Sequence, residues 1–519
     1  MRNSGISLRR VFFACVLLGT AVCAWSLPVD SIANAVMQAL AASRVSQADS
    51  FSRELVVALP ENPYAAHIRS IVLYETGDYA AAFAQAQKSI DNLSAVGADI
   101  RMRLVNQYDY LKSAMPVLAS FRAREGKHFI FYYADPKDSI LANDVLNVLE
   151  QAREAMGSDL GYSPPDKIRV EAYRSRADFI TVSTLTEDEV TRTGTIALCK
   201  FNRMLFVSPR AVARGYEWQK TIAHEYVHFI VSRIAGNVIP IWLHEGTARY
   251  LESRYLKEEP ALSTVEQDLL FRAIKNNTLV SFSRMHPSMA KLKDAEEGAT
   301  AFAEVFCAIR FVVAKAGYRG LRDIIRGASA GLDLDSLLTH TVGAGTRPFE
   351  EVFFEHLRSL GIKPVEGASI TSKEFTEDNR PDEAVLFRKH VRLAELLLGQ
   401  NRAQAAVKEL ERADSTGKTR SPWIMNQIGQ LWERNGEPAN ALKAYERSIF
   451  LFPEYCNGYF NSALLREKQG DAATAAALLR KTLEINPYHV PAREALVSLT
   501  RDKAEAERQK AILRVIQGE

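Results

Sequence analysis

The sequence predicts an α+β fold, with a mixed central domain between two helical blocks. Short runs of β-branched and aromatic residues, which are typical of strands, occur mid-chain at 129–133, 168–173 and 204–208. A stretch with helical periodicity, 139–160, separates the first two runs. From about Trp218 onward the central pattern becomes mostly helical. We therefore expect a sheet in the first half of the central domain and helices in its second half.

Length and composition restrict the class of protein. At 519 residues the chain is too long for one ordinary core, so several domains are expected. An apolar fraction of 47% and a charged fraction of 24% are typical of a folded soluble protein, and they argue against a polytopic membrane protein. The net charge of +3 is small, and the chain has no polybasic run or RNA-binding signature. We therefore expect no nucleic-acid partner.

The first 26 residues have the layout of a secretory signal peptide. Arginines at positions 2, 9 and 10 precede an apolar run over 11–24. That run is shorter than the roughly 20 residues that a bilayer-spanning helix needs. The sequence predicts an exported protein, periplasmic or secreted, without stable membrane insertion after signal cleavage. A retained N-terminal anchor is the alternative.

A 34-residue period marks the end of the chain. Three pairs of residues repeat at this spacing: Gly436 and Gly470, Ala441 and Ala475, and Pro453 and Pro487. These segments resemble tetratricopeptide repeats, with a weaker copy over 401–413 before them and a closing helix expected over 493–517. The segment 63–82 has the same pattern near the N-terminus. Plain amphipathic helix pairs without repeat ancestry are the alternative for both regions.

These features predict five parts of the chain. They are a signal peptide at 1–26, a helical repeat-like region at 27–122, the central domain at 123–360, a linker at 361–383 and a repeat solenoid at 384–519. With the solenoid treated as a tethered module, a chain truncated after Leu360 is expected to leave a folded, active central domain.

The central domain contains the motif His224-Glu225-Tyr226-Val227-His228 within a predicted helix. Residues four apart share one face of a helix, so His224 and His228 can bind the same zinc ion. Glu225 is offset by one residue, which suits it to act as a base beside the metal. A five-residue match of this kind arises by chance in roughly one in a hundred such chains, so a third ligand is needed.

The third ligand distinguishes the zinc-binding families. Metzincins are excluded because Val231 and Ile234 occupy the positions of their glycine and third histidine. The segment after Pro240 resembles the second helix of the gluzincins, whose pattern Trp-Leu-x-Glu-Gly-x-Ala is matched by Trp242, Leu243, Glu245, Gly246 and Ala248. The resemblance implies Glu245 as the third ligand of one zinc ion.

Two neighbours of the ligands are expected to support them. Glu252 lies two helical turns after Glu245, where it can accept a hydrogen bond from the far nitrogen of a ligand histidine. His244 is expected beside the ligands rather than as a fourth ligand, because a catalytic zinc keeps one position open.

From about residue 128 to 360 the sequence resembles the peptidase-MA-like domains found beside tetratricopeptide repeats. Gly161-Tyr162, 302–317 and 321–325 contribute to the likeness. Relatives often carry tyrosine at the position of Phe302, where a phenol stabilises the oxyanion. His244, Tyr250, His286 and Tyr318 are the candidates to replace it. Segments 194–199 and 204–208 are expected to form a hairpin whose edge, by resemblance, lines the cleft and pairs with an extended peptide.

The sequence therefore predicts zinc-dependent peptide-bond hydrolysis, with repeats that recruit the protein substrate or a protein partner. The alternative is a tetratricopeptide scaffold that carries a weakly active or inactive zinc-binding domain. A non-peptidase zinc hydrolase fits less well, because two histidines and a glutamate on helices are chiefly peptidase features.

Overall fold

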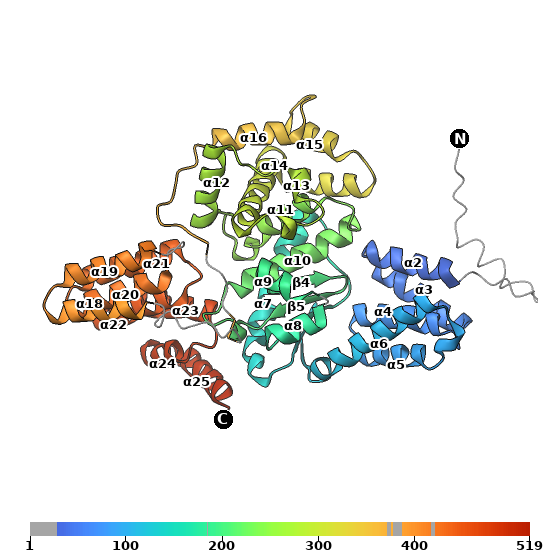
Figure 1. Ribbon diagram of the computed structural model, residues 1–519, viewed down its shortest axis with the longest axis horizontal. Coiled ribbons are helices and arrows are strands. Elements are labelled where there is room, and N and C mark those ends of the chain that lie inside the picture. The colour runs from blue at the N-terminus through green and yellow to red at the C-terminus, as the bar shows by residue number, and fades with distance from the viewer. Residues whose placement is uncertain (1–28, 184, 371–374, 377–386, 417–420, 519) are drawn as a thin grey trace, which may run out of the picture.

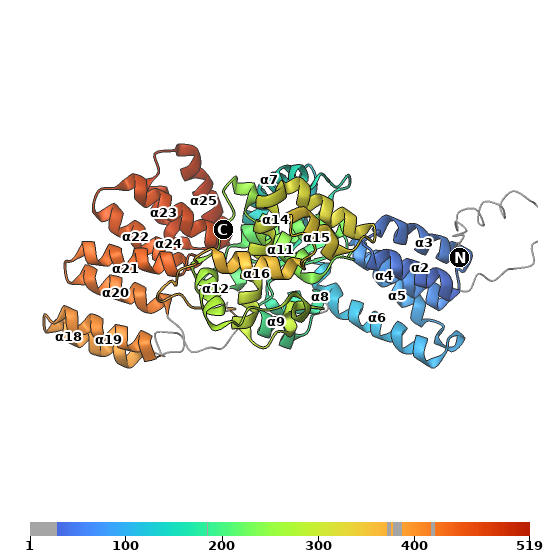
Figure 2. The ribbon, with the colours of Figure 1, turned by 90° about the horizontal axis from the view of Figure 1, so that it is seen from above.

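The computed structural model describes residues 29–183, 185–370, 375–376, 387–416 and 421–518. The predicted signal peptide lies outside the described residues. A central domain with one sheet stands between two all-helical blocks, which lie at opposite ends of the long axis (Figures 1 and 2). The α+β class predicted from the sequence is confirmed. No helix within the described ranges has both the length and the apolar character needed to cross a bilayer.

The N-terminal block consists of antiparallel helices that pack in sequence order. It contains α2 (Val29–Ala41), α3 (Val45–Ala58), α4 (Pro63–Thr76), α5 (Tyr79–Ile90), the short helix η1 (Leu93–Ala95) and α6 (Ala98–Leu118). Asn62 caps α4 by accepting the N–H groups of Tyr64 and Ala65, and Pro63 occupies its first turn. Gly77, with φ of 87°, ends α4 in the left-handed conformation. The helix–turn–helix pattern predicted over 63–82 is therefore α4 and α5.

The central domain begins with a mixed sheet in the order β1-β2-β3-β5-β4. The strands are β1 (Arg122–Glu125), β2 (Phe129–Tyr133), β3 (Ile168–Tyr173), β4 (Ala197–Lys200) and β5 (Arg203–Val207). The three inner strands are parallel, and both edge strands, β1 and β4, are antiparallel to their neighbours. β4 and β5 form the predicted hairpin.

Different parts of the chain cover the two faces of this sheet. Phe131, Val170 and Met204 are in register and share one face. α7 (Ala142–Leu160) and α10 (Trp218–Ala235) pack together on that side, where Phe129 meets Tyr226 of α10. Alternate residues face the N-terminal block: the guanidinium of Arg203 binds Tyr79 of α5. The N-terminal block is therefore one of the layers that enclose the sheet.

Helices form the rest of the central domain. Between β2 and β4 the chain adds η2 (Pro136–Leu141), α8 (Arg176–Ser183) and α9 (Glu187–Thr193), and η3 (Pro209–Ala211) follows β5. After α10 come α11 (Ile241–Leu251), η4 (Arg254–Leu256), α12 (Thr264–Asn276), α13 (Phe282–Met285), η5 (Met289–Lys291), α14 (Ala295–Ser329), α15 (Leu334–Val342) and α16 (Phe349–Ser359). Trp242 of α11 stacks on Phe282 at 4.1 Å and on Phe349 at 5.9 Å, which ties α11, α13 and α16 together.

The C-terminal block is a stack of antiparallel helix pairs. It contains α18 (Arg388–Gly399), α19 (Ala403–Thr416), α20 (Pro422–Arg434), α21 (Pro438–Leu451), α22 (Cys456–Lys468), α23 (Ala472–Ile485), α24 (Val490–Leu499) and α25 (Lys503–Gln517). Gly436 and Gly470 make the interhelical turns in left-handed conformations. A Cβ atom on Gly429 would lie 2.2 Å from the ring of Tyr445, so this glycine permits the close contact of α20 with α21.

The expectation of one closing helix over 493–517 is wrong. The chain breaks at Thr500, whose ψ of 134° is extended, and the side chain of Asp502 caps a new helix, α25.

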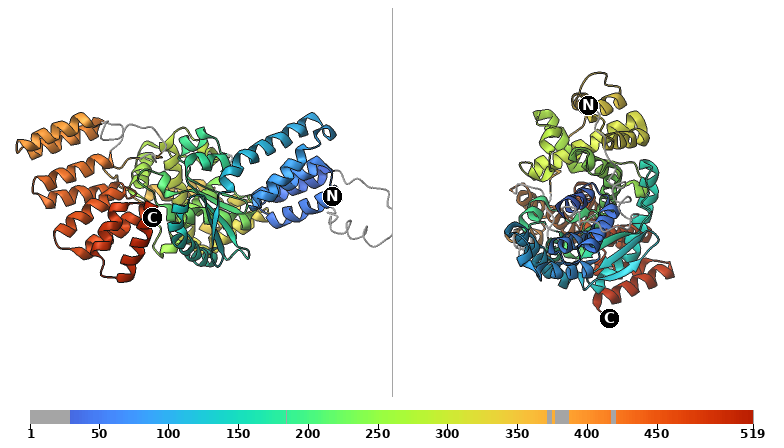
Figure 3. Two further views of the ribbon diagram at one scale, coloured as in Figure 1. Left: turned by 90° about the horizontal axis from the view of Figure 1, so that it is seen from below. Right: turned by 90° about the vertical axis from the view of Figure 1, so that its right-hand side faces the viewer.

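The C-terminal block is docked on the central domain. Ile485 accepts a hydrogen bond from the N–H of Tyr216 at 3.1 Å, and the phenol of Tyr488 donates to the buried Asp138 at 2.5 Å. The described part of the predicted linker also packs: Val365 donates its N–H to Asp268 and lies against Phe452 of the repeats. The left view of Figure 3 shows the block beside the central domain from a further direction. The C-terminal block is therefore packed on the central domain and is not a freely tethered solenoid.

The docked C-terminal block contradicts the expectation that a chain truncated after Leu360 keeps an independent central domain. Tyr488→Phe tests the docking contact in the full-length protein. Burial raises the pKa of Asp138, and its hydrogen bonds to Tyr488 and Ser208 oppose that rise. Loss of the phenol should lower the free energy of unfolding by about 1–3 kcal/mol in a urea titration. Tyr64→Phe, in the N-terminal block, is the control for loss of a phenol elsewhere. Equal stabilities of the two variants would show that the contact with Asp138 contributes nothing.

Candidate metal centre

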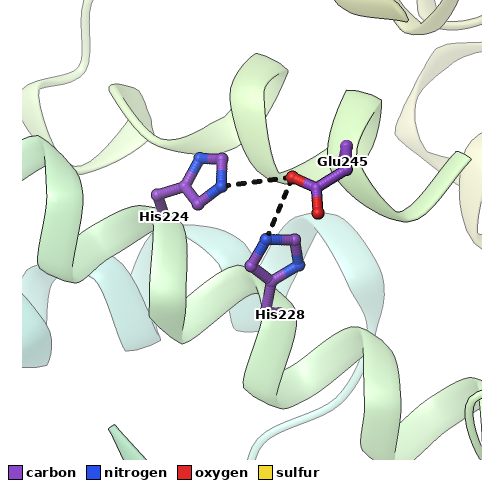
Figure 4. A group of neighbouring side chains, drawn as sticks. All are labelled: His224, His228 and Glu245. Atoms are coloured by element: carbon purple, nitrogen blue, oxygen red, sulfur yellow. Dashed lines mark ion pairs between the residues drawn. The ribbon is translucent and has the colours of Figure 1, made fainter. Parts of the chain in front are cut away.

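Two helices bring the predicted ligands together. α10 presents His224 and His228 one turn apart, and α11 presents Glu245 opposite them (Figure 4). A carboxylate oxygen of Glu245 lies 3.6 Å from Nε2 of His224 and 3.4 Å from Nε2 of His228. Gly236, with φ of 62°, ends α10 and lets the chain turn toward α11.

These three residues fit one metal ion. Their donor atoms all lie within 4.8 Å of one another, and no other group of three such residues converges in this way within the described ranges. Ligands bound tetrahedrally at about 2.0–2.2 Å from one zinc ion are about 3.4 Å apart, close to the two distances measured here. Two imidazoles and one carboxylate also match the donor set of a catalytic zinc site.

The electrostatics of the site favour a bound cation. Burial opposes the charged form of His224, but the nearby carboxylates of Glu245 and Glu252 outweigh it and raise the pKa of His224 to about 10. Burial likewise opposes ionisation of Glu245, but His228 and His224 hold its pKa well below the usual range. Without metal the site therefore holds a proton between histidine and carboxylate. A metal ion would displace that proton, so its affinity depends on pH.

A chain of ion pairs orients His224. Its Nδ1 lies 2.9 Å from Glu252, the residue expected there. Arg249 donates to the other oxygen of Glu252 at 2.7 Å and makes two further hydrogen bonds, of 2.8 and 2.6 Å, to Glu266. Such a chain fixes the ring so that Nε2 faces the other ligands.

Sequence reasoning missed Arg249 and Glu266. A signal for each was present: Arg249 lies one turn after Glu245 on the same helix, and Glu266 completes the capping box that begins at Ser263. Glu266 therefore both caps α12 and holds Arg249.

His244 supports His228 by stacking. The two rings are parallel within 14° and 4.5 Å apart, and Nε2 of His244 lies 3.2 Å from the hydroxyl of Ser232. Burial, reinforced by the charge of His228, lowers the pKa of His244 to about 3, so its ring is neutral. Nδ1 of His228 is buried without a hydrogen-bond partner. The stacked ring therefore replaces the polar partner that His224 has, and His244 is not among the converging donors.

Glu225 lies between the ligand helix and the edge strand. Its side chain is buried, and burial raises its pKa. The backbone of Cys199, in β4, faces this carboxylate and opposes the rise in its pKa. The predicted base thus lies beside the predicted edge strand.

The other oxyanion candidates lie elsewhere. Tyr250 packs against Phe306 and Tyr318, His286 is exposed, and Phe302 packs against the hydrophobic core. Within the described part of the chain, no hydrogen bond connects them to the ligand set.

The glycine after Glu245 sets the position of α11. A Cβ atom on Gly246 would lie 2.8 Å from the carbonyl oxygen of Val305 and 2.9 Å from Ile309, both on α14. Glycine therefore permits α11 to approach the backbone of α14, and this contact fixes the depth at which Glu245 stands.

Comparison with known proteins supports this description. Residues 151–358 match the family model of the Peptidase MA superfamily, which confirms that the central domain is of the peptidase-MA-like type recognised from the sequence. A search of curated protein sequences found no significant match.

Three solved structures that resemble this chain do so at low TM-scores. A crystal structure of MamA is 18% identical and covers 25% of this chain and 76% of its own, with a TM-score of 0.21. Leukotriene A4 hydrolase from Saccharomyces cerevisiae is 12% identical and covers 76% and 67%, with a TM-score of 0.31. The tetratricopeptide domain of P58(IPK) is 12% identical and covers 95% and 99%, with a TM-score of 0.18.

Gly246→Ala should weaken metal binding without removing a ligand. The added methyl group forces α11 away from α14, an overpacking that costs about 1–3 kcal/mol. Because Glu245 moves with α11, we expect the zinc affinity to fall by about 10–100-fold, as after loss of a supporting contact. Competition with a chelator measures the affinity. Thr247→Ser, at the next position, removes one methyl group and should leave it unchanged. Wild-type affinity in Gly246→Ala would contradict this role.

Proposed function

We propose that this chain is a zinc metallopeptidase that acts outside the cytoplasm. One observation carries the proposal: two imidazole nitrogens and one carboxylate oxygen converge within 4.8 Å, with a second, buried carboxylate on the same helix as the histidines. The match of residues 151–358 to the Peptidase MA superfamily supports a metallopeptidase. The arginines and the apolar run at the N-terminus support export.

The residues divide the chemistry of hydrolysis among them. His224, His228 and Glu245 would hold a zinc ion, which polarises a carbonyl and lowers the pKa of a water molecule at its open position. Glu225 then accepts a proton from that water molecule on a carboxylate oxygen and delivers it to the nitrogen of the leaving amine. Its pKa, raised by burial, suits a group that must both take up and release a proton.

The edge strand favours an extended peptide as substrate. Ile196 accepts the N–H of Val207, so in an antiparallel ladder the main-chain groups of Ala197 and Cys199 point away from β5. β4 packs on α10, and the backbone of Cys199 lies next to the Glu225 carboxylate, so the edge strand is beside the proposed base. A peptide that pairs with this edge would bring its carbonyl groups near the ligand set.

The second candidate is an interaction scaffold whose zinc site turns over slowly. Phe302, where relatives often have a tyrosine, favours it. The buried Glu225 and the oriented ligands favour the peptidase, because a scaffold does not need a base beside its metal.

Paired variants test the peptidase. Glu225→Gln keeps all three ligands and should abolish hydrolysis while one zinc ion per chain remains bound. Glu245→Ala removes a ligand and should reduce zinc affinity as well as activity. Metal analysis and cleavage of a broad peptide library give the two readouts. An active Glu225→Gln variant would refute the mechanism, and a wild type with zinc but no cleavage of any peptide would support the scaffold.

The C-terminal block is proposed to recruit the protein substrate or a partner. A groove of about 270 Å³ crosses α20, α22 and α24. It is lined by amide and aromatic side chains, among them Gln430, Asn457, Asn461 and Phe460. Amide side chains carry both a donor and an acceptor, so they can pair with the main chain of an extended peptide.

Gln430→Glu combined with Asn457→Asp should separate recruitment from catalysis. The two added carboxylates repel the carbonyl oxygens of a bound peptide, and their desolvation against its main chain is unfavourable. We expect kcat/KM to fall at least about fivefold for a protein that carries the cleavage sequence, with little change for the short peptide. Glu446→Gln, on α21, is the control. Equal changes for both substrates would argue against recruitment by this groove.

A further inference from the structure

The N-terminal block forms ion pairs with the tip of the β4–β5 hairpin. Lys200 and Arg203 are register partners at the end of the hairpin. Both contact one carboxylate, that of Glu75 in α4: Nζ of Lys200 lies 3.3 Å from one oxygen and Nη2 of Arg203 lies 3.1 Å from the other. A single side chain from the N-terminal block therefore binds both strands of the hairpin.

The charges of Arg203 and Glu75 are buried, and each stabilises the other. Arg203 is 1% exposed and Glu75 is 6% exposed. Arg203 also bonds the phenol of Tyr79 at 2.9 Å and lies 3.8 Å from the fully buried Glu171. Breaking a buried ion pair by removing one partner is strongly destabilising, because the other charge remains without water. Separation of the hairpin tip from Glu75 is therefore strongly unfavourable in free energy.

A second set of contacts joins the same three elements. Phe201, at the hairpin turn, packs against the core of the N-terminal block. The neighbouring Asn202 accepts a hydrogen bond from Arg233 of α10, and Arg233 also donates to the carbonyl of Ser43 at 2.9 Å. The N-terminal block thus holds both the edge hairpin and the end of the helix that carries the ligand histidines.

The hairpin also packs beside Glu225. β4 packs on α10, the helix that carries Glu225, and the backbone of Cys199, which directly precedes Lys200, lies next to the Glu225 carboxylate. A shift of the tip would move β4 against α10 and change the surroundings of the carboxylate that the proposed reaction uses.

We propose that Glu75 is a positioning residue for Glu225, acting through Lys200, Arg203 and the edge strand. The inference rests on the proposed peptidase function. It makes the N-terminal block part of the catalytic apparatus, although that block lies outside the region that matches the peptidase family. Glu75 touches neither the ligands nor a substrate, so its loss should change how Glu225 is held rather than whether metal binds.

Glu75→Gln in the full-length chain tests the proposal, because glutamine keeps the shape and removes the charge. We expect kcat for a short peptide to fall at least about tenfold with KM changed less than about twofold, as for a displaced catalytic group. Zinc content should stay at the wild-type value. Hydrogen–deuterium exchange of the amides over 197–203 should be at least about tenfold faster. Glu75→Asp, which restores the charge, should recover part of kcat.

Asp49→Asn is the matched control. Asp49 is also a carboxylate of the N-terminal block and pairs with Arg69 at 2.6 Å and with Arg53 at 2.7 Å, both inside that block. Its loss should lower Tm and leave both kcat and the exchange of 197–203 unchanged. If Glu75→Gln behaved like Asp49→Asn in both measurements, the proposal would be overturned.

Two further outcomes are decisive. Should Glu75→Gln not fold, Lys200→Met leaves the pair of Arg203 with Glu75 intact and should give smaller changes in the same direction; unchanged exchange and unchanged kcat would overturn the proposal. If the wild type cleaves no peptide, the proposed function fails. Exchange at 197–203 then decides the positioning role, since faster exchange in Glu75→Gln supports it and unchanged exchange refutes it.

Discussion

The close crossing of α10 and α11 is the constraint on which the site depends. Each helix contributes predicted ligands, so a metal ion can bind only when the two helices have one separation and one rotation. Gly246 lets α11 approach the backbone of α14, which fixes the position of Glu245, and Trp242 fixes the rotation of α11 by stacking on Phe282. The gluzincin-like pattern around Glu245 is thus a packing requirement as much as a ligand signature.

The ligand set and the outline of the fold were predictable because they are local. His224 and His228 share a helix, Glu245 lies on the next one, and four of the five strands and the 34-residue period are readable from short windows. The edge strand β1 was not predicted. The docking of the two helical blocks on the central domain was not predictable. It depends on pairs such as Asp138 with Tyr488 and Glu75 with Arg203, and no sequence periodicity links their positions. Arg249 was missed because its position one turn after Glu245 does not by itself show that it pairs with Glu252 and Glu266.

The two helical blocks hold opposite ends of α10. Near its start, Tyr216 bonds Ile485 of the C-terminal block; near its end, Arg233 and Asn237 bond Ser43 of the N-terminal block. A rigid helix held at both ends keeps its side chains in place even where a ligand such as His228 has no polar partner of its own. The repeats are therefore structural members of the central domain, whatever they also recruit.

The contact between Asp138 and Tyr488 spans 350 residues, so it cannot form until nearly the whole chain has been synthesised. Contacts of such separation close late in folding. While a chain is still emerging, its His-Glu-x-x-His helix also lacks the hydrogen bond from Tyr216, near its start, to Ile485. Full assembly of the centre would then coincide with release of the finished polypeptide. A centre with this order of assembly is complete only once the chain has left the machinery that made it.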